Sequence, residues 1–341
     1  MYRLKNWEFW PAWITNIPVV GFWLLQAVKT GNLFFFTTVN PGTMNGGMLG
    51  NSKMKILDAI PRQYLPQSAR FSDTPDRREK IMSFMRKNNI EFPVILKPDI
   101  GERGLRVMRI GNTGELDKYL GNAGYDLILQ EYVDYPMEVT ILCYIIPGTS
   151  EAGITSVCKK EFLGVKGDGV RSILQLIRDS ERGRLYENVL RETWDDAWHR
   201  VPEADETVYL QPIGNHCKGT KFINANHQID ARLIGTFTGI LKQMEGFSYG
   251  RFDLRCKSWE GLKAGRDFKV LEFNGVNSEP AHVYDPAYPV WRKYRDYYRQ
   301  WALMRRIYQA QAARGIRPLK LKDAIRQGKQ YFQYLQAVKS I

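Results

Sequence analysis

The chain has 341 residues and a hydrophobic content of 44%, which is enough for a large core or two lobes. Its four cysteines stand far apart and form no Cys-x-x-Cys pair, which argues against structural zinc and a disulfide framework and favours a reducing, cytoplasmic compartment. The formal net charge is +13, but residues 291–341 hold thirteen Lys/Arg against two Asp/Glu, so the rest of the chain is almost neutral. A basic segment confined to one end predicts an acidic partner, either anionic lipid or nucleic acid.

The N-terminal region is apolar. Residues 9–28 carry no charge and include three tryptophans, a run long enough by count to span a bilayer. Two prolines, an asparagine and a glycine within the run argue against one straight spanning helix. We expect a short apolar N-terminal lobe over residues 1–50, with a helix over 18–28 and a buried strand over 33–39. This lobe belongs either to the core or to a membrane-facing side.

Strands and helices alternate through the middle of the chain. Helices are expected over 53–59, 77–88, 114–120, 173–179, 181–197 and 227–243, a loop over 164–170, and strands over 93–97, 105–110, 126–130, 137–145, 151–160, 207–213, 219–223, 248–256 and 268–274. This rhythm predicts an α+β fold of two lobes with mainly antiparallel sheets. We expect a first lobe over 51–135, a second lobe over 136–290 and a basic helical tail over 291–341.

A lysine ends one apolar strand and a glycine-bearing loop follows it. Lys97 closes the strand, and Gly101 and Gly104 come directly after it. A lysine in this position can reach nucleotide phosphates as a point charge, and the glycines let the loop fold closely over them. The alternative is an ordinary strand-end lysine before a β-turn.

Residues 127–133 form an apolar strand that leads into a polar hinge. Such a segment, with Gln130, Glu131 and Val133, can hydrogen-bond an adenine edge through its backbone while Glu138 accepts from ribose hydroxyls. Any sheet strand followed by a turn has a similar pattern, so this segment indicates a nucleotide site only in combination with the other motifs.

Two later strands carry the strongest constellation, Asp253 on one and Glu272 with Asn274 on the other. Residues two apart on a strand face the same side, and carboxylate and amide oxygens are the ligands that Mg²⁺ prefers. Arg251 shares the face of Asp253 and could stabilise an oxyanion. A salt-bridged strand pair is the alternative for these residues alone. Together with Lys97 they predict a site for ATP and Mg²⁺.

These motifs resemble those of the ATP-grasp superfamily, specifically the carboxylate–amine ligases that include D-alanine–D-alanine ligase. Residues 92–107 are similar to the family's Lys-Pro strand and glycine loop, and 129–140 to its hinge and ribose glutamate. Residues 250–253 and 271–274 resemble its Gly-Arg-x-Asp and Glu-x-Asn metal motifs. The resemblance implies an ATP-grasp fold, and it implies that Lys53, in a segment similar to the family's early lysine segment, helps to bind phosphates.

A second resemblance concerns the loop Val165–Ile173, which is similar to the Gly-Asp-Gly loop of cyanophycin synthetase-like and glutathione synthetase-like ligases. It implies that Lys160 lies near the phosphates, and Gly214–Gly219 resembles a glycine-rich turn of the same relatives. The chain departs from the dipeptide ligases in its short apolar N-terminal lobe and at Asn277–Pro280. Both departures fall where the acceptor would sit and put a D-alanine substrate in doubt.

The resemblance implies an enzyme that joins a carboxylate to an amine through an acyl phosphate and releases ADP and phosphate. Arg251 and Lys160 would act in catalysis, and the substrates would be small molecules or lipid-linked compounds. A non-catalytic ATP-binding module attached to membrane or nucleic acid is the alternative, against which the intact metal triad argues. The sequence names neither substrate and leaves the oligomeric state open.

The C-terminal tail repeats aromatic residues at helical spacing with arginines beside them. This pattern suits a helix that packs its aromatic stripe on the body, an anionic membrane surface on which the protein would sit peripherally, or a nucleic acid, which is the least favoured partner. The aromatic residues are Trp291, Tyr294, Tyr298, Trp301 and Tyr308, and the arginines are Arg292, Arg295, Arg299 and Arg306.

Overall fold

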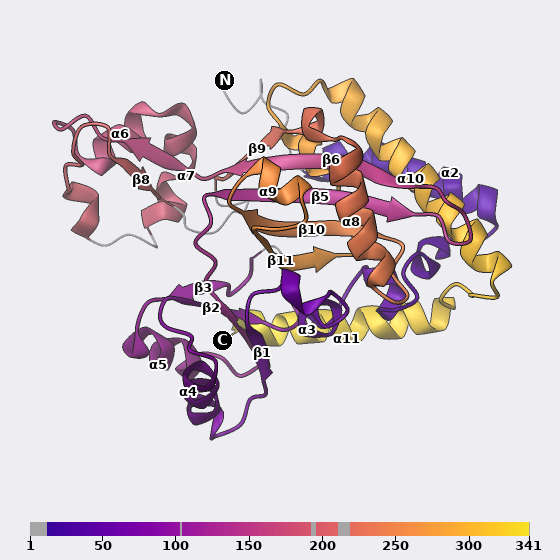
Figure 1. Ribbon diagram of the computed structural model, residues 1–341, viewed down its shortest axis with the longest axis horizontal. Helices are drawn as coiled ribbons and strands as arrows, with labels where there is room; N and C mark the ends of the chain where they lie inside the picture. Colours follow the sequence, from indigo (N-terminus) through magenta and orange to yellow (C-terminus); the bar gives the residue numbers. More distant parts are fainter. Residues whose placement is uncertain (1–11, 103, 192–195, 211–218, 341) are drawn as a thin grey trace.

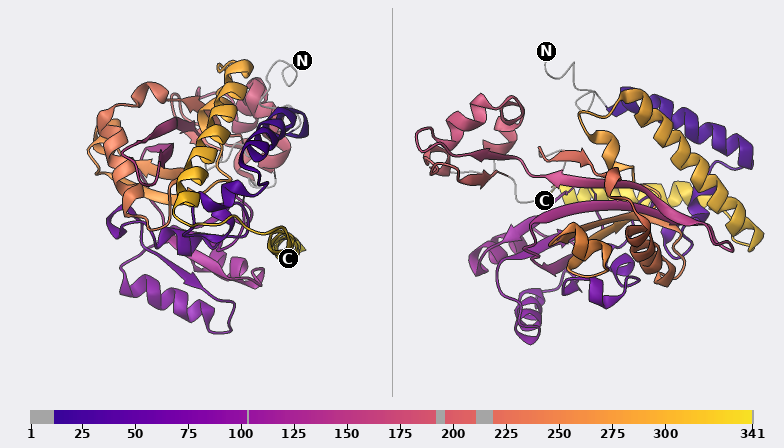
Figure 2. Two further views of the ribbon diagram at one scale, coloured as in Figure 1. Left: turned by 90° about the vertical axis from the view of Figure 1, so that its right-hand side faces the viewer. Right: turned by 45° about the horizontal axis from the view of Figure 1, so that its top comes forward.

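Two antiparallel sheets of unequal size, each with its own core, organise the molecule (Figure 1). The computed structural model describes residues 12–102, 104–191, 196–210 and 219–340. The long C-terminal helices run beside both sheets, and a small separate unit projects from one side (Figures 1 and 2). The predicted glycine-rich turn at 214–219 lies almost wholly outside the described residues.

The small sheet has four strands, in the order β1 (Ser68–Phe71), β4 (Leu127–Glu131), β2 (Val94–Pro98) and β3 (Met108–Ile110). Helices α4 (Arg77–Lys87) and α5 (Thr113–Gly121) pack on it. Leu96, Leu116 and Leu127 are fully buried between these layers. The register places Lys97 opposite Ile128, at the end of β2 that leads into the glycine loop.

The large sheet has five strands, in the order β11 (Phe268–Asn274), β10 (Tyr249–Cys256), β5 (Met137–Ile145), β6 (Ala152–Glu161) and β9 (Lys221–Asn224). Helices α8 (Ala231–Gln243) and α9 (Trp259–Lys263) lie on one face, together with α3 (Lys53–Leu57). The pairing of β10 with β11 sets Asp253 opposite Glu272 and Arg251 opposite Asn274. This register brings the predicted metal residues together.

The projecting unit consists of β7 (Gly164–Lys166) paired with β8 (Thr207–Tyr209) and the helices α6 (Ile173–Asp179) and α7 (Glu181–Arg191). Its small core contains Ile173, Ile177 and Leu190. The predicted loop at 164–170 therefore begins with a short strand. The two-lobe α+β prediction with mainly antiparallel sheets is confirmed, and the sheets fall on either side of residue 135, while the exact domain limits stay a prediction.

The prediction of a strand over 33–39 is wrong. Phe35–Thr38 form a short 3-10 helix. The Thr37 and Thr38 hydroxyls donate to the Phe34 and Phe35 carbonyl oxygens at 2.7 and 3.0 Å, which stabilises the helical turn. The Phe35 ring is buried against a helix and not within a sheet. A short apolar run in the sequence has the same pattern whether it is buried as a strand or as a helical turn.

The first described helix, α2 (Ala12–Thr30), is longer than the predicted helix at 18–28 and contains Pro18. Helix α10 (Val290–Ala313) packs beside it, and its Trp301 and Tyr308 lie 6.0 and 6.1 Å from the Phe35 ring, measured between centroids. Part of the aromatic stripe of the tail is thus core. Among the described residues, no helix combines the length and the apolar character needed to cross a bilayer.

The last helix, α11 (Leu321–Ser340), reaches the small sheet (Figure 1). Val338 is 1% exposed and belongs to the core of that sheet. Nearer its start, Gln327 accepts a hydrogen bond from the Asn45 amide at 3.2 Å. The C-terminal tail therefore packs on the body as part of the fold.

Asn40 joins the N-terminal region to β10 through four hydrogen bonds. Its side-chain oxygen accepts from the Ser248 and Tyr249 N–H groups at 2.9 and 3.0 Å, and its amide donates to the Gly46 and Tyr249 carbonyl oxygens at 3.0 and 2.8 Å. Asn40 is fully buried, so water cannot replace its side chain as the hydrogen-bond partner of these backbone groups. Asn40 therefore satisfies backbone groups at the start of the strand that carries Arg251 and Asp253.

We expect Asn40→Ala to lower the free energy of unfolding by about 3–5 kcal/mol, because buried backbone groups lose their partners. Urea denaturation measures the change. The exposed Asn122→Ala is the matched control, with an expected loss of under about 0.5 kcal/mol. Equal losses in the two variants would contradict the role of Asn40.

Candidate functional site

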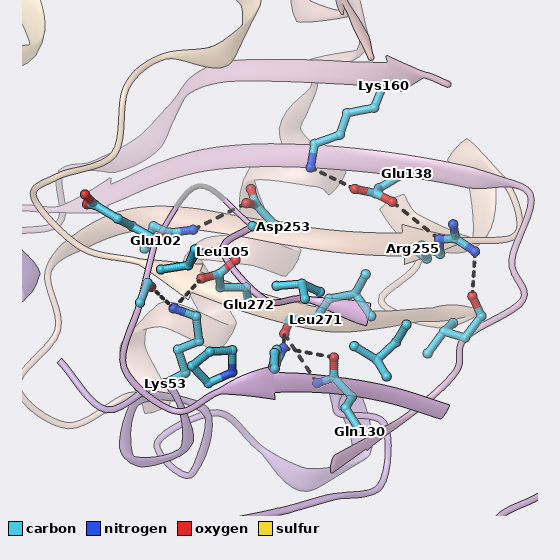
Figure 3. A pocket seen from close by; sticks show the side chains of 18 of the residues that line it. Lys53, Glu102, Leu105, Gln130, Glu138, Lys160, Asp253, Arg255, Leu271 and Glu272 are labelled. Carbon is cyan, nitrogen blue, oxygen red and sulfur yellow. Dashed lines mark hydrogen bonds and ion pairs between the residues drawn. The ribbon is translucent and has the colours of Figure 1, made fainter. Parts of the chain in front are cut away.

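A cavity of about 290 Å³ lies between the two sheets and is lined by residues from both (Figure 3). All thirteen site residues expected from the sequence line it: Lys53, Lys97, Gly101, Gly104, Gln130, Glu131, Val133, Glu138, Lys160, Arg251, Asp253, Glu272 and Asn274. The structure thus brings the predicted set together in one place. Their individual roles stay predictions.

Lys97 is buried at the end of β2 and bridges the two sheets. Its amine donates to the Gln130 side-chain oxygen at 3.1 Å and to the Leu271 carbonyl oxygen at 3.0 Å. Burial lowers the pKa of Lys97 to about 8, and the negative charge of Glu272 only partly offsets that cost. A buried lysine held by neutral oxygens is ready to accept an anionic partner.

Lys53 reaches the same cavity from the start of α3, where Ser52 caps the helix. Its amine donates to the Gly101 carbonyl oxygen and lies 3.4 Å from a Glu272 carboxylate oxygen. The buried Asp99 holds this helix start in place, because its carboxylate accepts from the Ser52 hydroxyl at 2.9 Å and the Met54 N–H at 3.0 Å. Strand β2 thus positions both lysines, one directly and one through Asp99.

The second half of the site comes from β10 and β11. Arg251 grips the Asp253 carboxylate with two hydrogen bonds of 2.8 and 3.1 Å. Burial alone would raise the pKa of Asp253, but the charges of Arg251 and Lys160 outweigh it and lower the pKa, so the group is anionic. Gly250 must be a glycine, because a Cβ there would lie 2.2 Å from the Phe273 ring. The Gly-Arg-x-Asp pattern thus reflects close packing as well as chemistry.

The oxygen-rich set of Asp253, Glu272 and Asn274 fits magnesium by its donor chemistry. Asp253 and Glu272 are direct partners in the sheet register, and the Asn274 amide lies 3.3 Å from an Asp253 oxygen. In the described parts of the chain, no three His, Cys, Asp or Glu side chains gather as a metal site. A cation at this site would therefore be coordinated by two carboxylates, by one amide oxygen and by oxygen atoms of a molecule bound with it.

At the other end of the cavity, Glu138 sits between two cations. Lys160 lies 2.7 Å and Arg255 lies 3.4 Å from its carboxylate oxygens (Figure 3). Burial alone would lower the pKa of Lys160, but the charges of Glu138 and Asp253 and the hydrogen bond to Glu138 together outweigh it and raise the pKa. Glu138 was predicted to accept from ribose hydroxyls, and Lys160 to contact phosphates. In this structure the two side chains are partners of each other.

Sequence reasoning missed Arg255 and Asp99. Arg255 donates to the Val133 carbonyl oxygen at 2.9 Å and stacks over the Tyr132 ring at 5.3 Å, so it fastens the hinge to the large sheet. The period-two spacing of Arg251, Asp253 and Arg255 on β10 was the available signal, because all three share one face. For Asp99, the only signal was a carboxylate directly after Lys97-Pro98.

Comparison with known families identifies part of the chain. Residues 52–176 match the family model of the RimK-like ATP-grasp domain. The chain has an ATP-grasp fold. The predicted resemblance to the ATP-grasp superfamily is thereby confirmed. The match covers the small sheet, Lys97 and the hinge but ends before β10 and β11, so it does not reach the predicted metal residues.

Several solved structures have limited similarity to the chain. They include a bifunctional glutathione synthetase from Pasteurella multocida (17% identity, 68% of this chain and 34% of that chain, TM-score 0.35). They also include the VanG D-Ala:D-Ser ligase from Enterococcus faecalis (13%, 73% and 61%, 0.42) and the D-alanine–D-alanine ligase from Bacillus anthracis (13%, 65% and 56%, 0.38). The chain thus spans less than two thirds of each, and at these values the similarity says nothing about substrate. No curated protein sequence matches the chain.

The lowered pKa of Lys97 predicts pH-dependent ATP binding. A neighbouring triphosphate favours the charged amine and raises this pKa, so binding should take up a proton above about pH 8, and affinity should fall with rising pH by up to about tenfold per pH unit. Calorimetry in buffers of different ionisation enthalpy measures the uptake.

Lys97→Arg is the matched variant, because a guanidinium keeps its charge throughout this range. Subtracting the pH dependence measured for the variant from that of the wild type removes the contribution of the titration of ATP itself. If both show the same pH dependence, Lys97 is not the titrating phosphate ligand.

Proposed function

We propose that this protein is an ATP- and Mg²⁺-dependent ligase that joins a carboxylate to an amine. The observation that carries the proposal is one cavity that holds the buried Lys97 and the partly buried Lys53 together with Asp253 and Glu272. Lysine side chains bind phosphate oxygens, and carboxylate oxygens bind magnesium, so the two sets together suit a metal-bound triphosphate. The RimK-like ATP-grasp match over residues 52–176 supports ATP as the nucleotide.

In the proposed reaction, a carboxylate oxygen attacks the γ-phosphorus of ATP, the bond to the β–γ bridging oxygen breaks, and ADP leaves. The product is an acyl phosphate. The amine then attacks the acyl carbon, a tetrahedral oxyanion forms, and phosphate departs as the C–N bond is completed, with one amine proton lost to solvent or phosphate. Positioning and charge neutralisation supply most of the catalysis in such chemistry.

Each group would have a defined task. Lys53 and Lys97 would hold phosphate oxygens, and the hinge residues with Glu138 would hold the nucleoside. Asp253, Glu272 and Asn274 would hold magnesium, which when bound would neutralise charge on the phosphates. Arg251 would face the oxyanion while its pairing with Asp253 keeps its orientation fixed.

A second, smaller cavity of about 50 Å³ adjoins the first and shares Lys53, Glu102 and Glu272 with it. Asn277 and Tyr331 add to its lining. We propose that substrate groups reach the phosphates through this space, which lies where the sequence departs from the dipeptide ligases. Mass spectrometry of the purified protein for a retained acid, amine or lipid-linked compound would identify the substrate class.

The non-catalytic alternative is an ATP-binding module that is anchored to a membrane or a nucleic acid. It would keep the lysines and the hinge without needing the paired carboxylates. Substrate-dependent ADP release separates the two functions. A wild-type protein that binds ATP but releases no ADP with any acid and amine of a broad panel favours the module.

The metal assignment is tested by Glu272→Gln, which is nearly isosteric and should leave the fold intact. Loss of one negative charge that would hold magnesium should cost several kcal/mol of transition-state stabilisation, which corresponds to more than about a hundredfold in kcat/KM for ADP release. The control Glu260→Gln removes an exposed carboxylate that pairs with Arg232 and should be silent. Unchanged ADP release by Glu272→Gln at saturating magnesium would remove Glu272 from the metal site.

A further inference from the structure

Helix α2 presents a continuous apolar stripe to solvent. Ile17, Val20, Leu24 and Val28 follow one another at helical spacing and are 63%, 49%, 44% and 80% exposed. Four large aliphatic side chains in one row, three of them on consecutive turns, are unusual on a surface that meets only water. This stripe spans about 16 Å along the helix axis, at 1.5 Å per residue.

The opposite side of α2 is occupied by the body of the protein. The Phe22 ring meets Tyr298 of α10 edge-on at 5.7 Å, and the Gln26 side chain accepts from Arg305 at 2.9 Å. Ala27 is buried in the same core cluster as Phe35. The helix is therefore anchored along one side, and its apolar stripe is the side left over.

The neighbouring helix supplies positive charge and interfacial aromatics. Helix α10 contains six Lys/Arg against one Asp, and Trp291 is 62% exposed. The guanidinium groups of Arg292 and Arg295 lie 5.1 and 5.6 Å from the Trp291 ring centroid. Within residues 12–30 the only charged residue is Lys29, which is also positive. Viewed from the side of the molecule that carries both helices, α2 and α10 lie next to each other (Figure 2, left).

We propose that this face of α2 and α10, hereafter the α2–α10 face, binds the surface of an anionic lipid bilayer. The aliphatic stripe would enter the boundary between headgroups and acyl chains with α2 lying in the membrane plane, since its other side stays packed on α10. Trp291 suits the headgroup level, and the arginines beside it attract anionic lipids. The inference goes beyond ligation and does not depend on the proposed reaction.

Charge and side-chain type favour lipid over the other occupants. A second copy of the chain meeting this face about a two-fold axis would bring two basic α10 helices close together, which costs energy. A duplex offers phosphates, and a single strand offers phosphates and bases that stack on aromatic rings, so neither has a partner for the entirely aliphatic α2 stripe. An anionic bilayer is the partner that satisfies the aliphatic row and the flanking positive charge together.

Flotation of the full chain with lipid vesicles tests the proposal. Vesicles of phosphatidylcholine with about one third phosphatidylserine should carry the protein, and pure phosphatidylcholine vesicles should carry at least about tenfold less. The double variant Leu24→Gln/Val28→Gln should lose most binding at any salt concentration. The triple variant Arg292→Gln/Arg295→Gln/Arg299→Gln should weaken binding by about tenfold or more and should flatten its salt dependence.

The controls separate this proposal from folding and from ligation. Arg62→Gln/Arg232→Gln removes exposed arginines elsewhere and should bind vesicles as the wild type does. All changed side chains of the α2 stripe are solvent-exposed, so the melting temperature and ATP affinity of that variant should stay unchanged. Lys97→Ala, in contrast, should lose ATP affinity and keep vesicle binding.

Three results would overturn the proposal. Wild-type protein that ignores anionic vesicles, or binds neutral ones equally well, removes the lipid assignment. A dimer in solution that Leu24→Gln/Val28→Gln dissociates assigns the stripe to a second copy of the chain. Retardation of RNA at physiological salt that the triple arginine variant abolishes, without vesicle binding by the wild type, assigns the face to nucleic acid.

Discussion

The structure depends on how the buried charge of Lys97 and the partly buried charges beside it are balanced at the contact between the two sheets. Lys97 projects from the small sheet and donates a hydrogen bond to the Leu271 carbonyl oxygen of the large sheet, while Lys53 forms an ion pair with Glu272. A buried charge without a partner is costly, so such groups must hold each other or hold a ligand. The same side chains that join the sheets are therefore those that a metal-bound triphosphate would engage. Stability of the interface and the proposed nucleotide binding would be two uses of one set of charges.

Most of the site could be predicted because its signals are local. Lys97 with its glycine loop, and Glu272 with Asn274, each occupy a few consecutive residues whose spacing on a strand fixes their direction. Arg255 and Asp99 were missed because their importance is tertiary. Arg255 matters through the Val133 carbonyl oxygen, and Asp99 through the start of α3. The local signals, a shared strand face for Arg255 and a position directly after Lys97-Pro98 for Asp99, do not reveal which distant groups these side chains contact.

The fold was predictable in class and in most elements but not at the N-terminal end. The aromatic run around Phe35 has the composition of a strand, and only its packing against Trp301, more than 200 residues away, decides that it becomes a helical turn. The C-terminal tail was also hard to predict, because some residues of its aromatic stripe pack on the body and others face solvent. Trp301 and Tyr308 are partly buried and pack against the core, whereas Trp291 stays exposed beside arginines. Composition alone assigns both sets to one surface.

In the proposed function, one ATP molecule would bind both sheets at once. Hydrogen–deuterium exchange with a non-hydrolysable ATP analogue and magnesium tests it directly, because it reports on both sides of the cavity in one experiment. We expect slower exchange in the glycine loop at 99–107 and in the hinge at 131–135, together with slower exchange at 271–279, which covers the end of β11 and the loop after it. We expect no protection at 271–279 when magnesium is withheld. Protection confined to one side of the cavity, or protection of 271–279 that is indifferent to magnesium, would contradict the shared site.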